Sequence, residues 1–261
     1  MRRTTSDAKW ISNALTRIIA LLISTVFIVS TRLFLLDAQA KTLTIVAFGD
    51  STTAPRAGVV VYAKLLERLL LANNVEARII NAGVGGDTTD SGKTRFQRDV
   101  LNHQPDLVVL QFGINDSSVN VWETPPASTP TVAIDNYKDN LIGFIRTLKQ
   151  NGTEIILMTP NPLRWTDNLK KAYGKLPYDP EDPDGFNVLL KRYGSVVRLV
   201  ANQERIPLID VYQAFETYGA GKNRSINDLL LDGMHPNSAG HRIVASLLTN
   251  QIISRFGSTK K

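Results

Sequence analysis

Residues 43–52 read LTIVAFGDST, a short apolar run with β-branched residues that stops at a glycine. Such a run is typical of a strand buried on both faces of a sheet, because a strand with one wet face alternates apolar and polar residues. Similar runs predict four further strands, at residues 77–80, 107–112, 155–158 and 207–209. The repeated pattern favours a parallel sheet with helices on both sides.

The segments between these runs carry leucines and aromatic residues at helical spacing. They predict helices at residues 62–71, 91–101, 136–148, 186–202 and 237–253, of which 91–101 is polar and expected to be exposed. The fold class we expect is therefore α/β, a three-layer α/β/α sandwich around a mostly parallel five-stranded sheet. Proline-rich stretches predict two long loops, at residues 117–130 and 160–185.

Composition and charge narrow the possible functions. The chain has 261 residues, of which 43% are hydrophobic and 21% charged, as expected for one folded domain. It contains no cysteine, which excludes disulfides, thiolate metal sites and a cysteine nucleophile. The formal net charge of +6 is divided equally between residues 1–40 and 41–261. No dense basic run with interleaved aromatic residues is present, so we expect no nucleic-acid partner.

The first 40 residues are typical of an export signal. Arginines and a lysine precede an apolar run at 18–29, a second apolar stretch at 33–36 and the small-residue sequence Ala38-Gln39-Ala40. This is the order of a secretory signal peptide, and the uninterrupted run is shorter than the ~20 residues of a membrane-spanning helix. We expect residues 1–40 to be a signal peptide, or a signal anchor if uncleaved. Residues 41–261 would then form a periplasmic or secreted domain, which touches a membrane only through an uncleaved N-terminus.

Polar motifs follow the ends of the first three predicted strands. Residues 49–52, GDST, can expose the Ser51 hydroxyl at the sheet edge, although these residue types are also common in turns. Residues 81–89, NAGVGGDTT, lack the third glycine of a dinucleotide motif and the lysine of a phosphate loop. Within residues 113–116, GIND, the Asn115 amide can donate to a developing anion or form a local turn.

A fourth motif, DGMHPN at residues 232–237, precedes the last predicted helix. On a turn, the Asp232 carboxylate can bond one imidazole nitrogen of His235 and leave the other free as a base. The plainer interpretation is a solvated aspartate in a helix-capping loop. Of the other histidines, His103 falls in an ordinary loop, and His241 is a surface or packing residue of the last helix.

Taken together and in this order, the four motifs resemble the SGNH/GDSL hydrolase superfamily over residues 43–253. The resemblance implies a flavodoxin-like fold and serine ester hydrolysis, with Thr52 standing where the family name has leucine. It matches the nucleophile, acid and base to Ser51, Asp232 and His235. It matches the oxyanion hole to Ser51, Gly86 and Asn115, with Gly85 as the other candidate for the glycine.

The resemblance implies a reaction without metal or other cofactor. His235 takes the proton of Ser51 as the serine attacks the ester, and Asp232 orients the imidazole. We assign Asp50 and Asp116 to hydrogen bonding within loops. No G-x-S-x-G sequence is present, which excludes the nucleophile elbow of α/β-hydrolases.

The expected substrate is a small-molecule or polysaccharide ester. Residues 49–52 and 159–161 (TPN) look similar to carbohydrate acetylesterases of the superfamily, so our first hypothesis is removal of acetyl or other short acyl groups from carbohydrate. A lysophospholipase or thioesterase, an acyltransferase and a non-catalytic carbohydrate-binding protein on the same fold are the alternatives. The aromatic residues and the arginine of the two loops either stack on a sugar substrate or pack the loops against the domain. These residues are Trp122, Arg164, Trp165, Tyr173 and Tyr178. The oligomeric state is left open.

Overall fold

A five-stranded sheet forms the centre of the computed structural model, which describes residues 42–257. The strand order is β2-β1-β3-β4-β5, and all neighbouring strands are parallel. The strands are β1 (Leu43–Gly49), β2 (Ala77–Gly83), β3 (Leu107–Gln111), β4 (Glu154–Met158) and β5 (Leu208–Ile209). The α/β fold expected from the apolar runs is confirmed. The signal peptide or anchor expected at 1–40 lies outside the described residues and stays a prediction.

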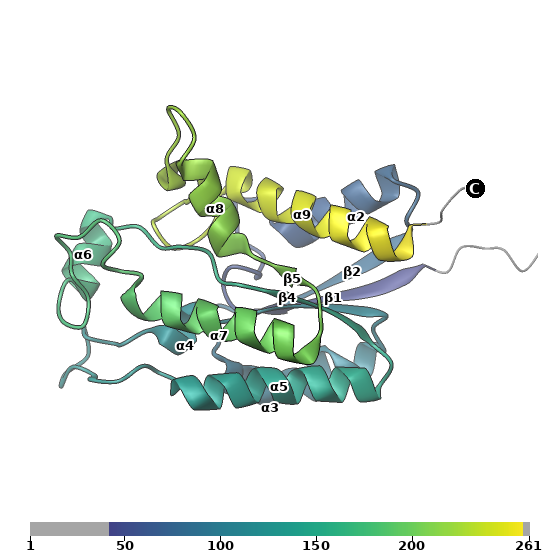
Figure 1. Cartoon of the computed structure of the whole chain (residues 1–261), viewed down its shortest axis with the longest axis horizontal. Coiled ribbons are helices and arrows are strands. Elements are labelled where there is room, and N and C mark those ends of the chain that lie inside the picture. Colours follow the sequence, from purple (N-terminus) through teal and green to yellow (C-terminus); the bar gives the residue numbers. More distant parts are fainter. Residues whose placement is uncertain (1–41, 258–261) are drawn as a thin grey trace, which may run out of the picture. The chain divides into compact units, whose positions relative to one another are not determined.

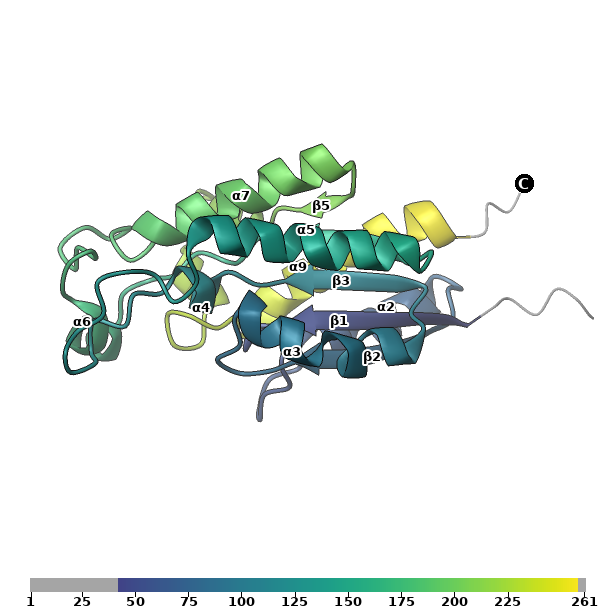
Figure 2. The ribbon, with the colours of Figure 1, turned by 90° about the horizontal axis from the view of Figure 1, so that it is seen from below.

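Helices cover both faces of this sheet (Figures 1 and 2). One side carries α2 (Tyr62–Ala72), α8 (Val211–Gly219) and α9 (Ser238–Phe256). The other side carries α3 (Thr89–Asp99), α5 (Ile134–Gln150) and α7 (Val188–Glu204). The chain therefore forms the three layers that the alternation of strands and helices predicts.

Several short helical elements were not predicted from the sequence. They are α4 (Ile114–Ser117), α6 (Asp167–Tyr173) and the 3₁₀ turns η1 (Leu101–His103) and η2 (Ile226–Leu229), together with α8. Side chains that cap their first turns stabilise two of them: Thr166 accepts from the Leu169 N–H of α6, and Asp210 from the Gln213 N–H of α8. Elements this short have too little helical periodicity to be recognised in a sequence.

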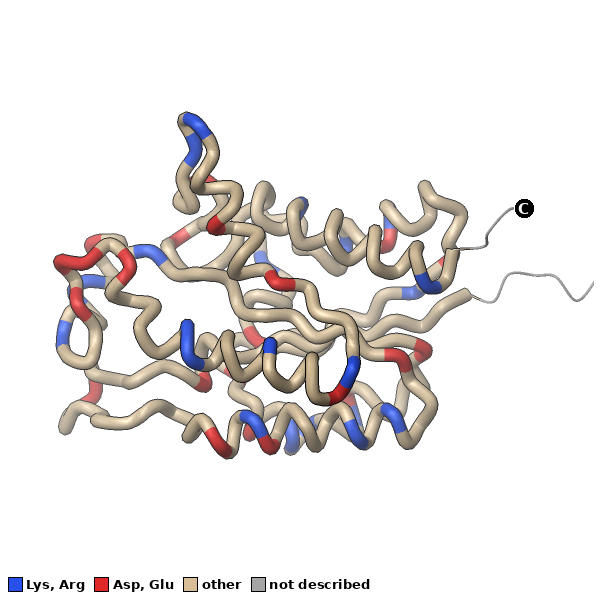
Figure 3. The backbone as a smooth tube through the Cα atoms, in the orientation of Figure 1, with Lys and Arg blue, Asp and Glu red and all other residues tan. Residues whose placement is uncertain are grey.

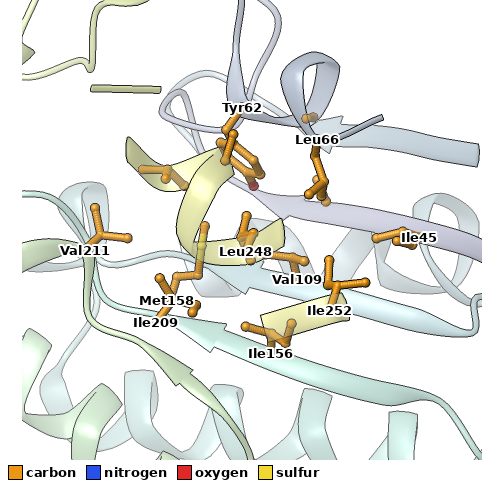
Figure 4. Packing of buried hydrophobic residues seen from close by; sticks show 14 of the residues in the cluster. Ile45, Tyr62, Leu66, Val109, Ile156, Met158, Ile209, Val211, Leu248 and Ile252 are labelled. Atoms are coloured by element: carbon orange, nitrogen blue, oxygen red, sulfur yellow. The ribbon is translucent and has the colours of Figure 1, made fainter. Parts of the chain in front are cut away.

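Two of the three core clusters cover the sheet, one on each side, and the third packs the long loops against α4 and the start of α7. Along β1, Ile45 and Ala47 pack toward α2 and α9, whereas Val46 and Phe48 pack toward α3, α5 and α7. Figure 4 shows the first cluster, in which Leu66 of α2 and Leu248 of α9 lie above the strands. Because successive strand residues point to opposite faces, a sheet covered on both faces needs apolar residues at nearly every position.

Helix α3 was expected to be exposed, and this prediction is wrong for one of its faces. Gly92, Arg95 and Phe96 are buried. A Cβ atom on Gly92 would lie 3.1 Å from the Phe112 ring and 3.3 Å from that of Phe48. The missing side chain lets this polar helix approach the sheet closely, which a count of its apolar residues does not reveal.

Charged residues of both signs are interspersed along α5, whereas α7 carries basic residues and one glutamate at its end (Figure 3). Such a surface is typical of solvated helices. Within residues 42–257, no helix has both the length and the apolar character needed to cross a membrane.

The register of the sheet brings three segments to one level. Gly49 at the end of β1 pairs with Gly83 at the end of β2 and with Gln111 at the end of β3. The chain leaves all three strands on the side where α4 and α6 lie (Figure 2). The polar motifs that follow these strands therefore start side by side.

Candidate active site

The segment after β1 leaves the sheet through a crowded glycine. A Cβ atom on Gly49 would lie 2.4 Å from the Gln111 carbonyl oxygen, so this position has no room for a side chain. A turn follows, in which the N–H groups of Thr53 and Ala54 donate to the Asp50 carbonyl. Ser51 lies half-buried on this turn.

The motif at residues 232–237 meets Ser51 across 184 positions of sequence. His235 Nε2 lies 2.9 Å from Ser51 Oγ, and His235 Nδ1 lies 2.8 Å from Asp232 Oδ2. The three side chains form one hydrogen-bonded row from carboxylate to hydroxyl. In this geometry Asp232 holds the imidazole orientation, and Nε2 faces the hydroxyl as a proton acceptor.

The loop after β4 holds the histidine turn in place. The Arg164 N–H donates to the Gly233 carbonyl at 2.8 Å, and the buried Asn161 amide donates to the Met234 carbonyl at 2.9 Å. Gly233 has a φ of +85°, and a Cβ atom there would lie 2.3 Å from the Arg164 carbonyl oxygen. Only glycine suits this position, because both the backbone angle and the space exclude a side chain.

Asp232 is charged at neutral pH. Partial burial raises the pKa of this carboxyl, but hydrogen bonds from the backbone N–H and imidazole of His235 and from the Met234 N–H outweigh it and leave the pKa below its usual range. The Oδ1 atom accepts those N–H groups at 2.9 Å and 3.0 Å. Asp232 thus keeps a negative charge beside His235 Nδ1.

The glycine-rich motif forms a turn beside Ser51. The Asp87 N–H donates to the Val84 carbonyl, and Gly86, with a φ of +80°, occupies the turn position that requires a left-handed residue. An added Cβ on Gly85 would lie 4.0 Å from Ser51 Cβ. Among residues 42–257, the N–H groups of Ser51, Gly85 and Gly86 have no hydrogen-bond partner.

Asn115 lies in the short helix α4, and its side chain points toward the glycine turn. Its Nδ2 donates to the Asp87 carbonyl at 2.9 Å, which uses one of the two N–H groups of the amide. The second N–H has no partner among the described residues. The structure therefore brings together Ser51, the Gly85-Gly86 turn and Asn115, which have unpaired N–H donors.

Two buried aspartates lie beneath these segments and form the loop hydrogen bonds expected of them. Asp50 Oδ1 accepts from the Thr52 N–H and hydroxyl, both at 2.8 Å. Asp116 Oδ1 accepts from the Thr89 N–H at 2.8 Å and the Thr89 hydroxyl at 2.5 Å. Burial raises the pKa of Asp50 to about 6 and that of Asp116 to about 7.

Gln111 supports the site and could have been noticed in the sequence, because it interrupts an otherwise apolar strand. It is 3% exposed. Its Oε1 lies 3.2 Å from the Thr52 hydroxyl oxygen, and its Nε2 donates to the Thr159 carbonyl at 3.0 Å. Gln111 therefore joins the serine turn to the end of β4.

The remaining histidines take no part in this arrangement. His241 is a packing residue, 2% exposed, and its Nδ1 accepts from the Tyr62 N–H at 3.2 Å. Burial lowers the pKa of His241 to about 4. His103 is exposed in η1.

Most of the loop residues considered for sugar stacking are engaged in packing. Trp165 stacks on Phe186 with ring centroids 4.4 Å apart, Tyr178 is buried and accepts from the Val119 N–H, and Arg164 pairs with Glu216. Tyr173 packs edge-on against Tyr178. Trp122, by contrast, is 55% exposed.

A family model described as the GDSL-like Lipase/Acylhydrolase family matches residues 47–243, which include every one of these motifs. The chain belongs to this family. It is therefore a carboxylic ester hydrolase with the SGNH fold expected from the motifs.

Sequence relatives of this chain include a lipoprotein and an esterase. The chain is 29% identical over 229 residues to the "Uncharacterized lipoprotein YqeF" of Bacillus subtilis, covering 81% of this chain and 90% of the relative. It is 28% identical over 178 residues to an acetylxylan esterase of Geobacillus stearothermophilus, covering 67% of this chain and 72% of the esterase. The solved structure of Axe2, an acetylxylan esterase from that organism, superimposes with a TM-score of 0.65 at 24% identity. The match covers 85% of this chain and 100% of Axe2, and it shows the shared fold.

Proposed function

We propose that this GDSL-family esterase works through an acyl-enzyme on Ser51, with His235 as general base and acid and Asp232 as its partner. The observation that carries the proposal is the hydrogen-bonded row from Asp232 through His235 to Ser51, with both contacts under 3 Å. A serine hydroxyl is a weak nucleophile at neutral pH, and a base within hydrogen-bonding reach removes its proton as it attacks.

The reaction then follows from the positions of these groups. Ser51 Oγ attacks the ester carbonyl while its proton passes to His235 Nε2, and the carbonyl oxygen becomes an oxyanion. The intermediate expels the alcohol, which takes the proton from His235. Water enters, gives a proton to the same nitrogen and attacks the acyl-enzyme. The second intermediate then breaks its bond to Ser51 Oγ, which takes the proton back from His235 as the acid is released.

We assign the oxyanion hole to the N–H groups of Ser51 and Gly86 and to the free N–H of the Asn115 amide. Donors that are fixed before the reaction stabilise the developing charge without rearranging. Two observations support this assignment. Ser51, Gly86 and Asn115 lie in segments that follow three adjacent strands ending at one level of the sheet. Each of the three residues also has an N–H group with no hydrogen-bond partner among the described residues. Gly86 is preferred to Gly85 because the motif resemblance matches it.

The substrate we propose is a carbohydrate ester carrying acetyl or another short acyl group. The acetylxylan esterase among the relatives supports this class. Trp122, on the loop that follows α4, adds support because it is 55% exposed and aromatic side chains suit contact with sugar rings. We further propose that residues 1–40 direct export, in agreement with the relative described as a lipoprotein. Isolation from a bacterial host tests export: cleavage gives a protein that starts at Lys41, and an anchor keeps the full chain in the membrane fraction.

A fluorophosphonate probe tests the nucleophile. Wild-type protein is expected to lose activity with one probe attached, and mass spectrometry should place the adduct on Ser51. Ser51→Ala should neither react nor hydrolyse p-nitrophenyl acetate while its circular dichroism is unchanged. Turnover retained in Ser51→Ala contradicts the proposal.

An ester panel then separates the substrate classes. Acetylated xylan and short p-nitrophenyl esters should be cleaved faster than long-chain esters, lysophospholipids or acyl thioesters. Preference for long acyl chains would instead support the lysophospholipase or thioesterase alternative.

A further inference from the structure

Arg95, a buried residue of α3, contacts the chain segments next to the residues of the proposed oxyanion hole. We propose that Arg95 is a positioning residue that holds the segments of Ser51, Gly86 and Asn115 in register. This inference rests on the proposed function of those three residues. Arg95 is buried, and two of its three closest partners are backbone carbonyls, so it acts through the backbone that carries the donors.

The side chain of Arg95 is enclosed at the carboxyl ends of β1 and β2. The residue is 6% exposed, and its guanidinium lies 4.5 Å from the centroid of the Phe48 ring. Its donors reach both strand ends and an acidic side chain: Nη2 donates to the Gly49 carbonyl at 2.9 Å, Nη1 to the Ala82 carbonyl at 2.7 Å and Nε to Asp87 Oδ2 at 2.5 Å.

Each of these contacts lies close to a proposed oxyanion donor. Gly49 is two positions before Ser51, and Asp87 directly follows Gly86. The third donor is reached through Asp87, whose carbonyl oxygen accepts the Asn115 amide at 2.9 Å. One guanidinium therefore connects the serine turn, the glycine turn and, through one residue, the asparagine.

The contacts require an arginine in particular. Its planar guanidinium presents donors in several fixed directions, so that one group can bridge two neighbouring carbonyls and a carboxylate. A lysine carries its donors on a single nitrogen and cannot span the same partners. The carboxylates of Asp87 and Asp99 lie beside the guanidinium and compensate its buried charge.

Loss of Arg95 should affect the transition state more than the bound substrate. The oxyanion exists only in the intermediate and its transition states, so displaced donors lower kcat while KM changes little. A misplacement of about 1 Å at a catalytic site can cost about 100-fold in rate. We expect Arg95→Ala and Arg95→Lys to lower kcat by roughly 10- to 100-fold, with KM within about twofold of wild type.

The test compares these variants with Arg98→Ala. Arg98 lies on the same helix, and its side chain is 75% exposed. Values of kcat are divided by the number of serines that react with a fluorophosphonate, so that misfolded protein is not counted. Arg98→Ala should match wild type. Unchanged kcat in both Arg95 variants would overturn the inference, and if Arg95→Ala does not fold, Arg95→Lys carries the measurement alone.

A rescue experiment separates positioning from general stability. Guanidinium at a low, non-denaturing concentration should raise the kcat of Arg95→Ala, or of Arg95→Gly if the alanine variant is insoluble, because it can occupy the vacated space between the two strand ends. No rise in either variant would assign Arg95 a purely structural role and overturn the proposal. Ser51→Ala distinguishes failure of this inference from failure of the proposed function. If the proposed function is wrong, Ser51→Ala in an otherwise wild-type protein retains activity.

Discussion

His235 Nε2 lies 2.9 Å from Ser51 Oγ, although 184 positions separate the two residues in the chain. The contact depends on two independent supports. The first is Gly49, which lies close to the Gln111 backbone at the end of β1, directly before the serine turn. The second is the loop after β4, in which Asn161 and Arg164 donate hydrogen bonds to the histidine turn. Changes in either support should therefore affect the same pair of atoms.

Asn115→Ala should lower kcat with little change in KM. The variant removes one proposed oxyanion donor, a loss that typically costs about 2.7–4 kcal/mol of barrier, or roughly 100- to 1,000-fold in kcat. The measurement is steady-state hydrolysis of p-nitrophenyl acetate. Asn120→Ala, in the loop that follows, is the control and should match wild type. An effect confined to KM would make Asn115 a substrate-binding residue instead.

Asp232→Asn should lower kcat by at least about 100-fold, because an amide no longer stabilises the protonated imidazole and can favour the wrong tautomer of His235. The side chain of Asp232 is 45% exposed, so solvent offsets part of the loss. The same p-nitrophenyl acetate assay measures this change, and Asp228→Asn in η2 serves as the control. A variant with wild-type kcat would show that His235 needs no carboxylate partner.

Asp116→Asn should become more stable relative to wild type as the pH rises. Burial raises the pKa of Asp116 to about 7, while an unfolded aspartate titrates near 3.9. Between about pH 4 and pH 7 the folded protein holds a proton that the unfolded chain has released, so the free energy of unfolding of the wild type falls as the pH rises. The asparagine variant lacks this dependence and keeps an oxygen that can accept from Thr89.

Urea unfolding at pH 5 and pH 8 measures the effect. The difference between Asp116→Asn and wild type should shift in favour of the variant by on the order of 2 kcal/mol between these two pH values. Asp139→Asn, at an exposed position of α5, provides the comparison and should show no such shift. A constant difference between Asp116→Asn and wild type at both pH values would mean that Asp116 is ionised in the folded protein throughout.

Gly49→Ala should destabilise the protein, because its Cβ would lie 2.4 Å from the Gln111 carbonyl oxygen and 2.5 Å from Thr53 Oγ1. Overpacking of this kind typically costs about 1–3 kcal/mol. Gly143→Ala is the matched control: it lies in α5 with nothing within 4 Å of an added Cβ, and should stabilise the helix by up to about 1 kcal/mol. Thermal unfolding of both variants gives the comparison, and equal melting temperatures would refute the expected clash.

Much of the fold could be predicted from local patterns. The apolar runs that begin at Leu43 and Leu107 are strands in a sheet covered on both faces, and five strands were expected and found. The short helices α4, α6 and α8 were not predicted, because so few residues show no clear period. The polar sequence of α3 led to the wrong prediction that this helix is exposed. One of its faces is buried, because Gly92 and Arg95 contact segments that are distant in the chain.

The sequence by itself determined the strands, their order of appearance and the motifs that follow them, because backbone preference and the alternation of side chains depend on near neighbours. Only the tertiary structure decided which side chains meet. Trp165 packs on Phe186 instead of facing a substrate, His241 accepts from α2, and Arg95 bridges two strand ends. Such contacts are set by the register of the sheet and the packing of layers, which join residues that no local pattern relates.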